Sequence, residues 1–230
     1  MGLTTVFGIN GVGKDTIAEG IIKNHPEIRV TSMSRLLMYS LGISKTCNIN
    51  EKISEEQYKI LEKTPQSIIV DIENKQYKQL LERMANSSEK VIFLSHLVSA
   101  LRLEGDTKYL TDKKIPDWLI EINDNLIQLV APVHIISERR KQDISRKREI
   151  DTYQILKHQE LCSKEWQRIK MLNPDQEYKM HIVQNIDLNK AISEVEEIIY
   201  GRNKKLPLIN NTNVEINLNS KESEDDDYSR

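Results

Sequence analysis

A glycine-rich segment near the N-terminus constrains this chain more than any other feature. Residues 8–16 are Gly-Ile-Asn-Gly-Val-Gly-Lys-Asp-Thr. A β-type apolar run, Leu3–Phe7, precedes them, and an amphipathic stretch with Ala18, Ile21 and Ile22 follows. A strand, a glycine-rich turn with a lysine, and a helix together form the context of a phosphate-binding loop. A plain glycine turn is the alternative, but three glycines, the lysine and both flanking elements argue against it.

The segment predicts that the chain binds a nucleoside triphosphate. Lys14 would reach the β- and γ-phosphates. The position after this lysine usually holds Ser or Thr, whose hydroxyl touches Mg²⁺, but here it holds Asp15. A carboxylate is a better ligand for a hard cation, although it places negative charge near the phosphates. We predict Asp15 as a metal ligand and the following as ATP-binding residues: Gly8, Asn10, Gly11, Val12, Gly13, Lys14, Asp15 and Thr16.

Length, charge and cysteine content narrow the class of protein. The 230 residues suit one domain with a sizeable core and a tail, and the net charge of −2 gives no general affinity for nucleic acid. Cys47 and Cys162 lie near no His/Cys cluster and predict reduced thiols. We see no signal peptide and no run of the ~20 apolar residues that a membrane helix needs. We expect a cytoplasmic protein without a membrane partner.

Strand-like runs alternate with helical patterns along the chain. The runs are Leu3–Phe7, Ile28–Thr31, Lys90–Leu94, Leu126–Val130 and Met180–Gln184. The helical patterns are Lys14–Asn24, Ser34–Leu41, Ser67–Ala85, Pro116–Asn123, Val133–Ser145, Thr152–Leu172 and Leu188–Tyr200. This alternation predicts an α/β fold with a parallel sheet covered on both faces. Ligands of such sheets bind beyond the C-terminal strand ends, so we expect the site in the loops after Phe7, Ser32, Leu94 and Val130.

Residues 202–230 have a different composition. Asparagines at 210, 211 and 213 and the acidic run Glu222–Asp227 leave little that could form a core. We expect a disordered acidic tail, which either has no function or binds a protein partner.

An arginine-rich segment, residues 138–148, follows the fourth predicted strand. Guanidinium groups stay charged and bind phosphate oxygens in pairs, which suits phosphoryl transfer. The segment could be a solvated helix face, but its place after that strand favours a lid over the phosphates. Two histidines are further candidates. His96 could contact a substrate or satisfy a backbone group, and His158 could reach back toward the lid or lie on the surface.

Four motifs in the same order make the chain resemble archaeal-type adenylate kinase-like P-loop kinases, whose eukaryotic relatives include a nuclear adenylate kinase linked to ribosome maturation. The first two are Gly8–Lys14 and Ser95-His96, which is similar to the end of the family's Asp-Thr-His strand. The third, Pro116–Leu119, is similar to its Pro-Glu-Trp-Val step. The fourth is similar to its lid and comprises Arg139-Arg140, Arg146–Glu149 and His158-Gln159.

The resemblance implies a P-loop NTPase three-layer α/β/α fold with a five-stranded parallel sheet of order 2-3-1-4-5. It implies a kinase domain over residues 1–201, with a monophosphate-binding region at about 34–85 and an arginine-rich lid at about 139–158. The implied reaction moves the γ-phosphoryl of ATP to a nucleoside monophosphate, with an AMP-like acceptor favoured and Mg²⁺ required. The implied catalytic residues are Lys14, Arg139, Arg146 and Arg148, and the implied acceptor-binding residues are Arg35, Ser95 and His96.

The chain departs from this family at several positions. Leu94 stands where the family carries the Asp that holds the Mg²⁺ shell. We hypothesise that Asp15 takes over that role, as Gly-Lys-Asp-Thr also resembles phage-type deoxynucleoside monophosphate kinases. No arginine occurs at 55–65, so Arg83 and Arg102 are possible substitutes. Two other functions remain open: an ATPase switch acting on a protein or ribonucleoprotein partner, and a nucleotide-binding module that has lost catalysis.

Overall fold

Five parallel strands form the central sheet of the protein. The computed structural model describes residues 2–49, 54–103, 106–110, 114–143 and 150–201. The strands are β1 (Gly2–Phe7), β2 (Arg29–Ser32), β3 (Lys90–Ser95), β6 (Asn123–Val130) and β7 (Met180–Gln184). Their order is β2-β3-β1-β6-β7, and each neighbouring pair is parallel. Because β6 and β7 are the fourth and fifth strands of this sheet, the predicted order 2-3-1-4-5 is confirmed.

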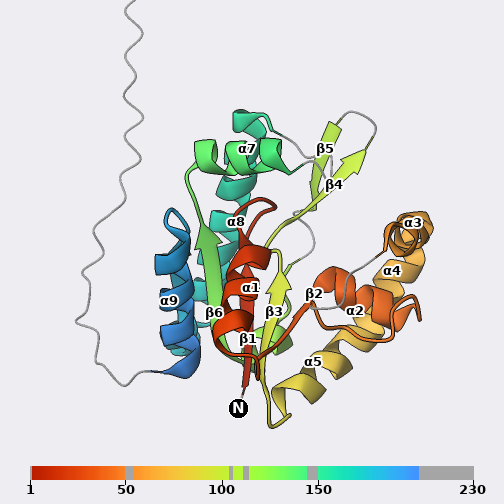
Figure 1. The fold of residues 1–230 in the computed structure, drawn as a ribbon, viewed down its shortest axis with the longest axis horizontal. Coiled ribbons are helices and arrows are strands. Elements are labelled where there is room, and N and C mark those ends of the chain that lie inside the picture. The colour runs from red at the N-terminus through yellow and green to blue at the C-terminus, as the bar shows by residue number, and fades with distance from the viewer. Residues whose placement is uncertain (1, 50–53, 104–105, 111–113, 144–149, 202–230) are drawn as a thin grey trace, which may run out of the picture.

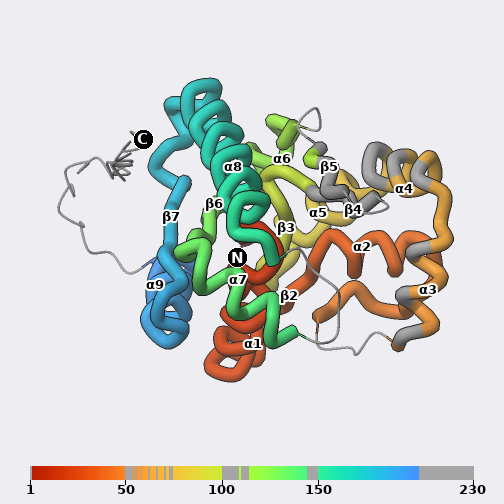
Figure 2. The backbone as a smooth tube through the Cα atoms, turned by 90° about the horizontal axis from the view of Figure 1, so that it is seen from above, coloured from red at the N-terminus to blue at the C-terminus, as the bar shows by residue number. Residues whose placement is uncertain are grey.

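Helices cover both faces of the sheet (Figures 1 and 2). One face carries α1 (Lys14–Asn24) and α9 (Leu188–Tyr200), and the other carries α5 (Lys78–Ala85) and α8 (Thr152–Leu172). The predicted bounds of α1, α8 and α9 agree with the structure. The shorter helices α2 (Met33–Ser40), α6 (Asp117–Glu121) and α7 (Val133–Gln142) end within a few residues of their predicted limits.

The sheet is buried because apolar side chains occupy both of its faces. All residues of β1 from Leu3 onward and all of β3 from Val91 onward are buried. Trp166 of α8 is 1% exposed and packs edge-on against Phe7, with ring centroids 6.3 Å apart. A strand covered on both faces needs this near-continuous apolar character.

The segment between β2 and β3 contains more helices than the sequence indicates. It holds α2, α3 (Glu55–Lys63), α4 (Gln66–Ile72), a π-helical turn η1 (Glu73–Tyr77) and α5. The single helix expected over Ser67–Ala85 is therefore interrupted. Ile72 and Tyr77 are both buried, five residues apart, and Tyr77 donates its hydroxyl to the Met33 carbonyl 2.9 Å away. A π turn accommodates a five-residue spacing on one face, which an α-helix does not.

A β-hairpin that the sequence analysis did not expect follows β3. Its strands β4 (Ser99–Leu103) and β5 (Asp106–Leu110) pair antiparallel and stand beyond the C-terminal edge of the sheet (Figure 1). Tyr109 donates its hydroxyl to the Gln154 carbonyl 2.8 Å away, which fixes the hairpin to α8.

A 3₁₀ turn, η2 (Pro174–Lys179), leads into β7 at the N-terminal edge of the sheet. Lys179 is 5% exposed and donates to the carbonyls of Ile120 and Asn123 at 2.5 and 3.0 Å.

Among the described residues, no helix combines the length and apolar surface that crossing a membrane requires. Arg146 and Arg148, which fall in the part of the predicted lid at 144–149, lie outside the described residues, as does the predicted tail at 202–230.

Candidate functional site

The loop between β1 and α1 forms two left-handed turns at glycine residues. Gly11 has φ 82° and Gly13 has φ 98°, a region that favours glycine over any residue with a Cβ. Gly13 also caps α1, and its carbonyl accepts from the Ile17 amide at 3.0 Å. The loop therefore curves back over the N-terminus of α1, where the helix dipole favours an anion.

The carbonyl groups of this loop accept hydrogen bonds from basic side chains. Lys14 is 9% exposed, and its Nζ donates to the carbonyls of Gly8 at 2.6 Å and Ile9 at 3.3 Å. Arg140 of α7 donates from Nε and Nη2 to the Asn10 carbonyl at 2.9 and 2.7 Å. With these carbonyl oxygens engaged, the loop is arranged to offer amide N–H groups to an anion.

Arg139 and Asn185 hold the next part of the loop. Arg139 donates from Nη1 to the Val12 carbonyl at 3.1 Å and from Nη2 to the Asn185 carbonyl at 3.2 Å. The Asn185 side chain donates from Nδ2 to the same Val12 carbonyl at 2.7 Å. Burial lowers the pKa of Arg139 from its usual value. The loop is thus bound to both α7 and the segment after β7.

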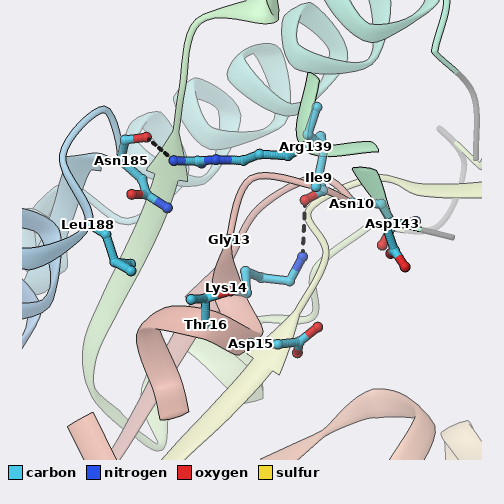
Figure 3. A pocket seen from close by; sticks show the side chains of 11 residues that line it. Ile9, Asn10, Gly13, Lys14, Asp15, Thr16, Arg139, Asp143, Asn185 and Leu188 are labelled. Carbon is cyan, nitrogen blue, oxygen red and sulfur yellow. Dashed lines mark hydrogen bonds between the residues drawn. The ribbon is translucent and has the colours of Figure 1, made fainter. Parts of the chain in front are cut away.

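These groups surround a cavity of about 350 Å³ (Figure 3). Its walls are the glycine-rich loop and the start of α1, the α7 end with Arg139 and Asp143, and the segment after β7 with Asn185 and Leu188. Lys14 lies at its centre, with Asp15 and Arg139 on different sides (Figure 3). The cavity lies beyond the C-terminal ends of β1 and β6, as expected for a sheet of this type.

Most of the predicted ATP-binding residues line this cavity. Asn10, Gly11, Gly13, Lys14, Asp15 and Thr16 do so directly. Gly8 contributes the carbonyl that holds Lys14, and Val12, which is fully buried, contributes a carbonyl to Arg139. The side chains of Asp15 and Thr16 are exposed, so a carboxylate and a hydroxyl face the cavity as oxygen donors of the kind that Mg²⁺ prefers.

The predicted acceptor-binding residues lie apart from the residues that line the cavity. Arg35 is 8% exposed and donates to the Ile49 carbonyl at 3.2 Å, at the start of α2. Ser95 is buried and donates to the sulfur of Met33, and His96 is half-buried directly after β3. Arg35 follows β2, whereas Ser95 ends β3 and His96 follows it, so all three lie at the C-terminal edge of the sheet. Their contact with an acceptor stays a prediction.

Leu94 is packed in the core at the end of β3. It is 3% exposed and lies opposite Val6 in the β1–β3 register. An apolar side chain at this place cannot hold a metal shell through water. The exposed carboxylate of Asp15 is the acidic group that the glycine-rich loop offers instead.

His158 and Gln159, adjacent residues of α8, contact the segments that follow two strands of the sheet. The Nε2 atom of His158 lies 2.8 Å from the Val98 carbonyl oxygen after β3, and Gln159 donates to the Ala131 carbonyl after β6 at 2.7 Å. His158 is 4% exposed, so it is not the surface residue that the sequence left open. Burial, with the charges of Arg140 and Lys14, lowers its pKa to about 4, although the Val98 hydrogen bond opposes the shift.

Sequence reasoning missed Asn185 and the role of Arg140. Asn185 is 1% exposed and follows β7 directly. The rule that directed attention to loops after four strands applies equally to the fifth, and it would have found this residue. Arg140 was named within the arginine-rich segment, but nothing in the sequence indicates that its partner is the Asn10 carbonyl.

Comparison with known proteins supports the architecture. No protein-family model matches the sequence, and no curated protein matches it significantly. A shikimate kinase from Aquifex aeolicus vf5 is 14% identical, with a TM-score of 0.50 over 86% of this chain and 96% of that chain. A gluconokinase from Sinorhizobium meliloti 1021 is 12% identical, with a TM-score of 0.46 over 88% of this chain and 98% of the other. The sheet order, the helices on both faces and the likeness to the shikimate kinase together show a P-loop NTPase α/β fold.

Proposed function

We propose that the protein is an ATP-dependent phosphotransferase that moves the γ-phosphoryl of ATP to a nucleoside monophosphate, with an AMP-like acceptor favoured. One observation carries the proposal. Lys14, the amide-presenting loop and Arg139 converge on a single cavity at the C-terminal edge of the sheet. Phosphoryl transfer needs positioning and charge neutralisation more than covalent chemistry, and these are the groups that supply both.

The ATP phosphates would bind to the amides of the loop and to Lys14. The lysine is already held over the loop by the Gly8 and Ile9 carbonyls, so little rearrangement separates it from a phosphate. The cavity continues toward Asn185 and Leu188, which gives the nucleoside a place beside Arg139. In this arrangement the triphosphate and base follow the wall between α1 and α9.

Magnesium would accompany ATP. The oxygen donors of Asp15 and Thr16 fit a hard cation, because both side chains are exposed and line the cavity. Bound there, Mg²⁺ would neutralise charge on the β- and γ-phosphates. Asp15 then supplies the carboxylate that Leu94 does not.

The acceptor would bind on the side of the cavity facing α2–α5. The proposal of a nucleoside monophosphate rests on the resemblance at Ser95-His96 and in the arginine-rich segment. It places Arg35 and His96 at the acceptor phosphate, and Arg139, Arg146 and Arg148 at the transferring phosphates. Closure of these arginines would exclude water and limit hydrolysis of ATP in the cytoplasm. The structural neighbour named as a shikimate kinase supports a small-molecule acceptor.

A second function, nucleotide binding without catalysis, is favoured by one observation. Leu94 is buried where a carboxylate would hold the metal shell. A third function is an ATPase that acts on a protein or ribonucleoprotein partner through the acidic tail. The experiment below also distinguishes this function.

The test is a coupled ADP-release assay with Mg-ATP and a panel of ribo- and deoxynucleoside monophosphates. A no-acceptor sample and the Lys14→Met variant serve as controls. An acceptor that raises ADP release well above the no-acceptor rate supports the kinase and identifies its substrate. If ADP is released at the same rate with and without an acceptor, the result contradicts the kinase proposal and favours an ATPase. ATP binding without turnover favours the binding module.

A further inference from the structure

Arg140 contacts the glycine-rich loop from α7 in a way that a lid arginine would not. It is 6% exposed, and both Nε and Nη2 donate to one acceptor, the Asn10 carbonyl, at 2.9 and 2.7 Å. Arg139, the preceding residue, lines the cavity, whereas the residues around the cavity do not include Arg140. The two neighbouring arginines therefore have different surroundings and need different explanations.

Packing around Gly11 shows how closely α7 approaches the loop. A Cβ added at Gly11 would lie 2.8 Å from Cγ of Arg140 and 3.3 Å from Cγ2 of Ile136. Gly11 also has φ 82°, so glycine is required there both for its backbone conformation and for the room that Arg140 occupies. The Arg140 side chain thus lies close beside Gly11, with its guanidinium on the Asn10 carbonyl.

The planarity of the peptide bond links this contact to ligand binding. The Asn10 carbonyl and the Gly11 amide belong to one trans peptide unit, so they point in opposite directions. Arg140 holds the carbonyl on the α7 side, which directs the Gly11 N–H away from α7, and Gly11 lines the cavity. A cation on the carbonyl also polarises the peptide and makes its N–H a stronger donor.

We infer that Arg140 is a positioning residue that orients the Asn10–Gly11 peptide so that the Gly11 amide donates to the phosphates of the nucleotide. The inference rests on the proposed function, because it assumes that phosphates occupy the loop. It assigns Arg140 no contact with the nucleotide itself. Phosphates bound by the loop amides are shared by ATP, ADP and pyrophosphate, so Arg140 supports binding of all three to the same degree.

The experiment measures dissociation constants of ATP, ADP and pyrophosphate by calorimetry for wild type, Arg140→Met and Arg140→Lys. Lys141→Met is the matched control, since Lys141 is an exposed cation on the same helix. Arg140→Met is expected to weaken all three ligands by one common factor of about tenfold, the scale of a charge-assisted hydrogen bond. Arg140→Lys keeps the charge but offers no planar pair of donors, so its loss is intermediate.

Glycine-selective ¹⁵N spectra provide a readout that does not depend on affinity. The chain has eight glycines, so each resonance can be followed individually. The Gly11 resonance is expected to move in the Arg140 variants without ligand. The Gly13 resonance is expected to stay, because Arg139 and Asn185 hold its peptide.

The outcomes separate this inference from the proposed function. If wild type binds none of the three ligands, the proposed function is overturned together with the inference. If wild type binds them and both Arg140 variants bind equally well, only the inference is overturned. A loss confined to ATP also overturns it, because Arg140 would then act on the γ-phosphate. Should Arg140→Met fail to fold, wild-type affinities in Arg140→Lys would still contradict the inference.

Discussion

The Nε2 atom of His158 lies 2.8 Å from the carbonyl oxygen of Val98, which joins α8 to the segment that leaves β3. A carbonyl oxygen only accepts, so Nε2 carries a proton. Because the pKa of His158 is lowered to about 4, the other ring nitrogen is unprotonated and the ring is neutral at neutral pH. The ring centroids of His158 and Tyr109 are 4.9 Å apart, so one neutral histidine contacts both the residue that precedes β4 and a residue of β5.

Acid is expected to destabilise the protein through His158. Its pKa falls from 6.5 to about 4 on folding, so between these values the unfolded chain binds more protons than the folded one. The free energy of unfolding therefore rises with pH through this window, and the full contribution of His158 is present above it. Replacing the imidazole by the non-titrating amide in His158→Gln is expected to remove about 2 kcal/mol from the difference between about pH 5 and about pH 7.5.

Urea unfolding of wild type and variant at the two pH values measures this effect. His134 is exposed on α7, and His134→Gln is the control that should leave the pH dependence unchanged. Equal pH dependence in wild type and His158→Gln would show that His158 is not the group responsible.

Gly13 and Asn185 are expected to be coupled in stability. A Cβ at Gly13 would lie 2.3 Å from Nδ2 of Asn185, in a backbone conformation with φ 98°. Gly13→Ala is expected to cost about 1–3 kcal/mol from backbone strain and the clash. Asn185→Ala is expected to cost about 1–3 kcal/mol, because the buried Val12 carbonyl loses a donor.

The double variant should cost less than the sum of the two, since removing Asn185 makes room for the new methyl group. A double-mutant cycle by urea denaturation measures the coupling. Strict additivity would mean that the clash is relieved elsewhere in the loop.

Asp15→Ser is expected to abolish magnesium-dependent turnover, because it removes the exposed carboxylate at the start of α1 and the buried Leu94 supplies none. Glu19→Ser, which removes an exposed acid one turn further along α1, should leave turnover unchanged. The measurement is ADP release as a function of Mg²⁺ concentration. Full activity in Asp15→Ser would rule out its role as a metal ligand.

Lys14→Met is expected to lower kcat/KM for ATP on the order of a hundredfold, the scale of losing one preorganised charge at a transferring phosphate. Lys23→Met, at an exposed position near the end of α1, is the control. Steady-state ADP release compares the two. Similar activity in both variants would exclude Lys14 from the reaction.

The sheet and its covering helices could be predicted from sequence because each of their signals is local. The β1 strand, the glycine-rich turn and α1 are contiguous, and the bounds of α1, α8 and α9 follow from hydrophobic periodicity. The helix α3 had a local signal as well. Ser54 and Gln57 form a capping box, and its Ser-x-x-Gln spacing is visible in the sequence.

Other features depend on contacts between distant parts of the chain. The π turn η1 ends at Tyr77, which donates to the carbonyl of Met33, 44 residues away, and no local pattern encodes that contact. The Arg140–Asn10 contact spans 130 residues and the Asn185–Val12 contact spans 173. A motif identifies the loop, but the donors that shape it come from elements whose positions only the fold determines.

The attachment of Val12 to Asn185 has a consequence for synthesis of the protein on the ribosome. The loop is made before its partner, from which it is separated by 173 residues. During translation the nascent chain lacks this donor until β7 has left the exit tunnel. The arrangement of the loop that Arg139 and Asn185 hold is therefore completed only after β7 has been made and has joined the sheet.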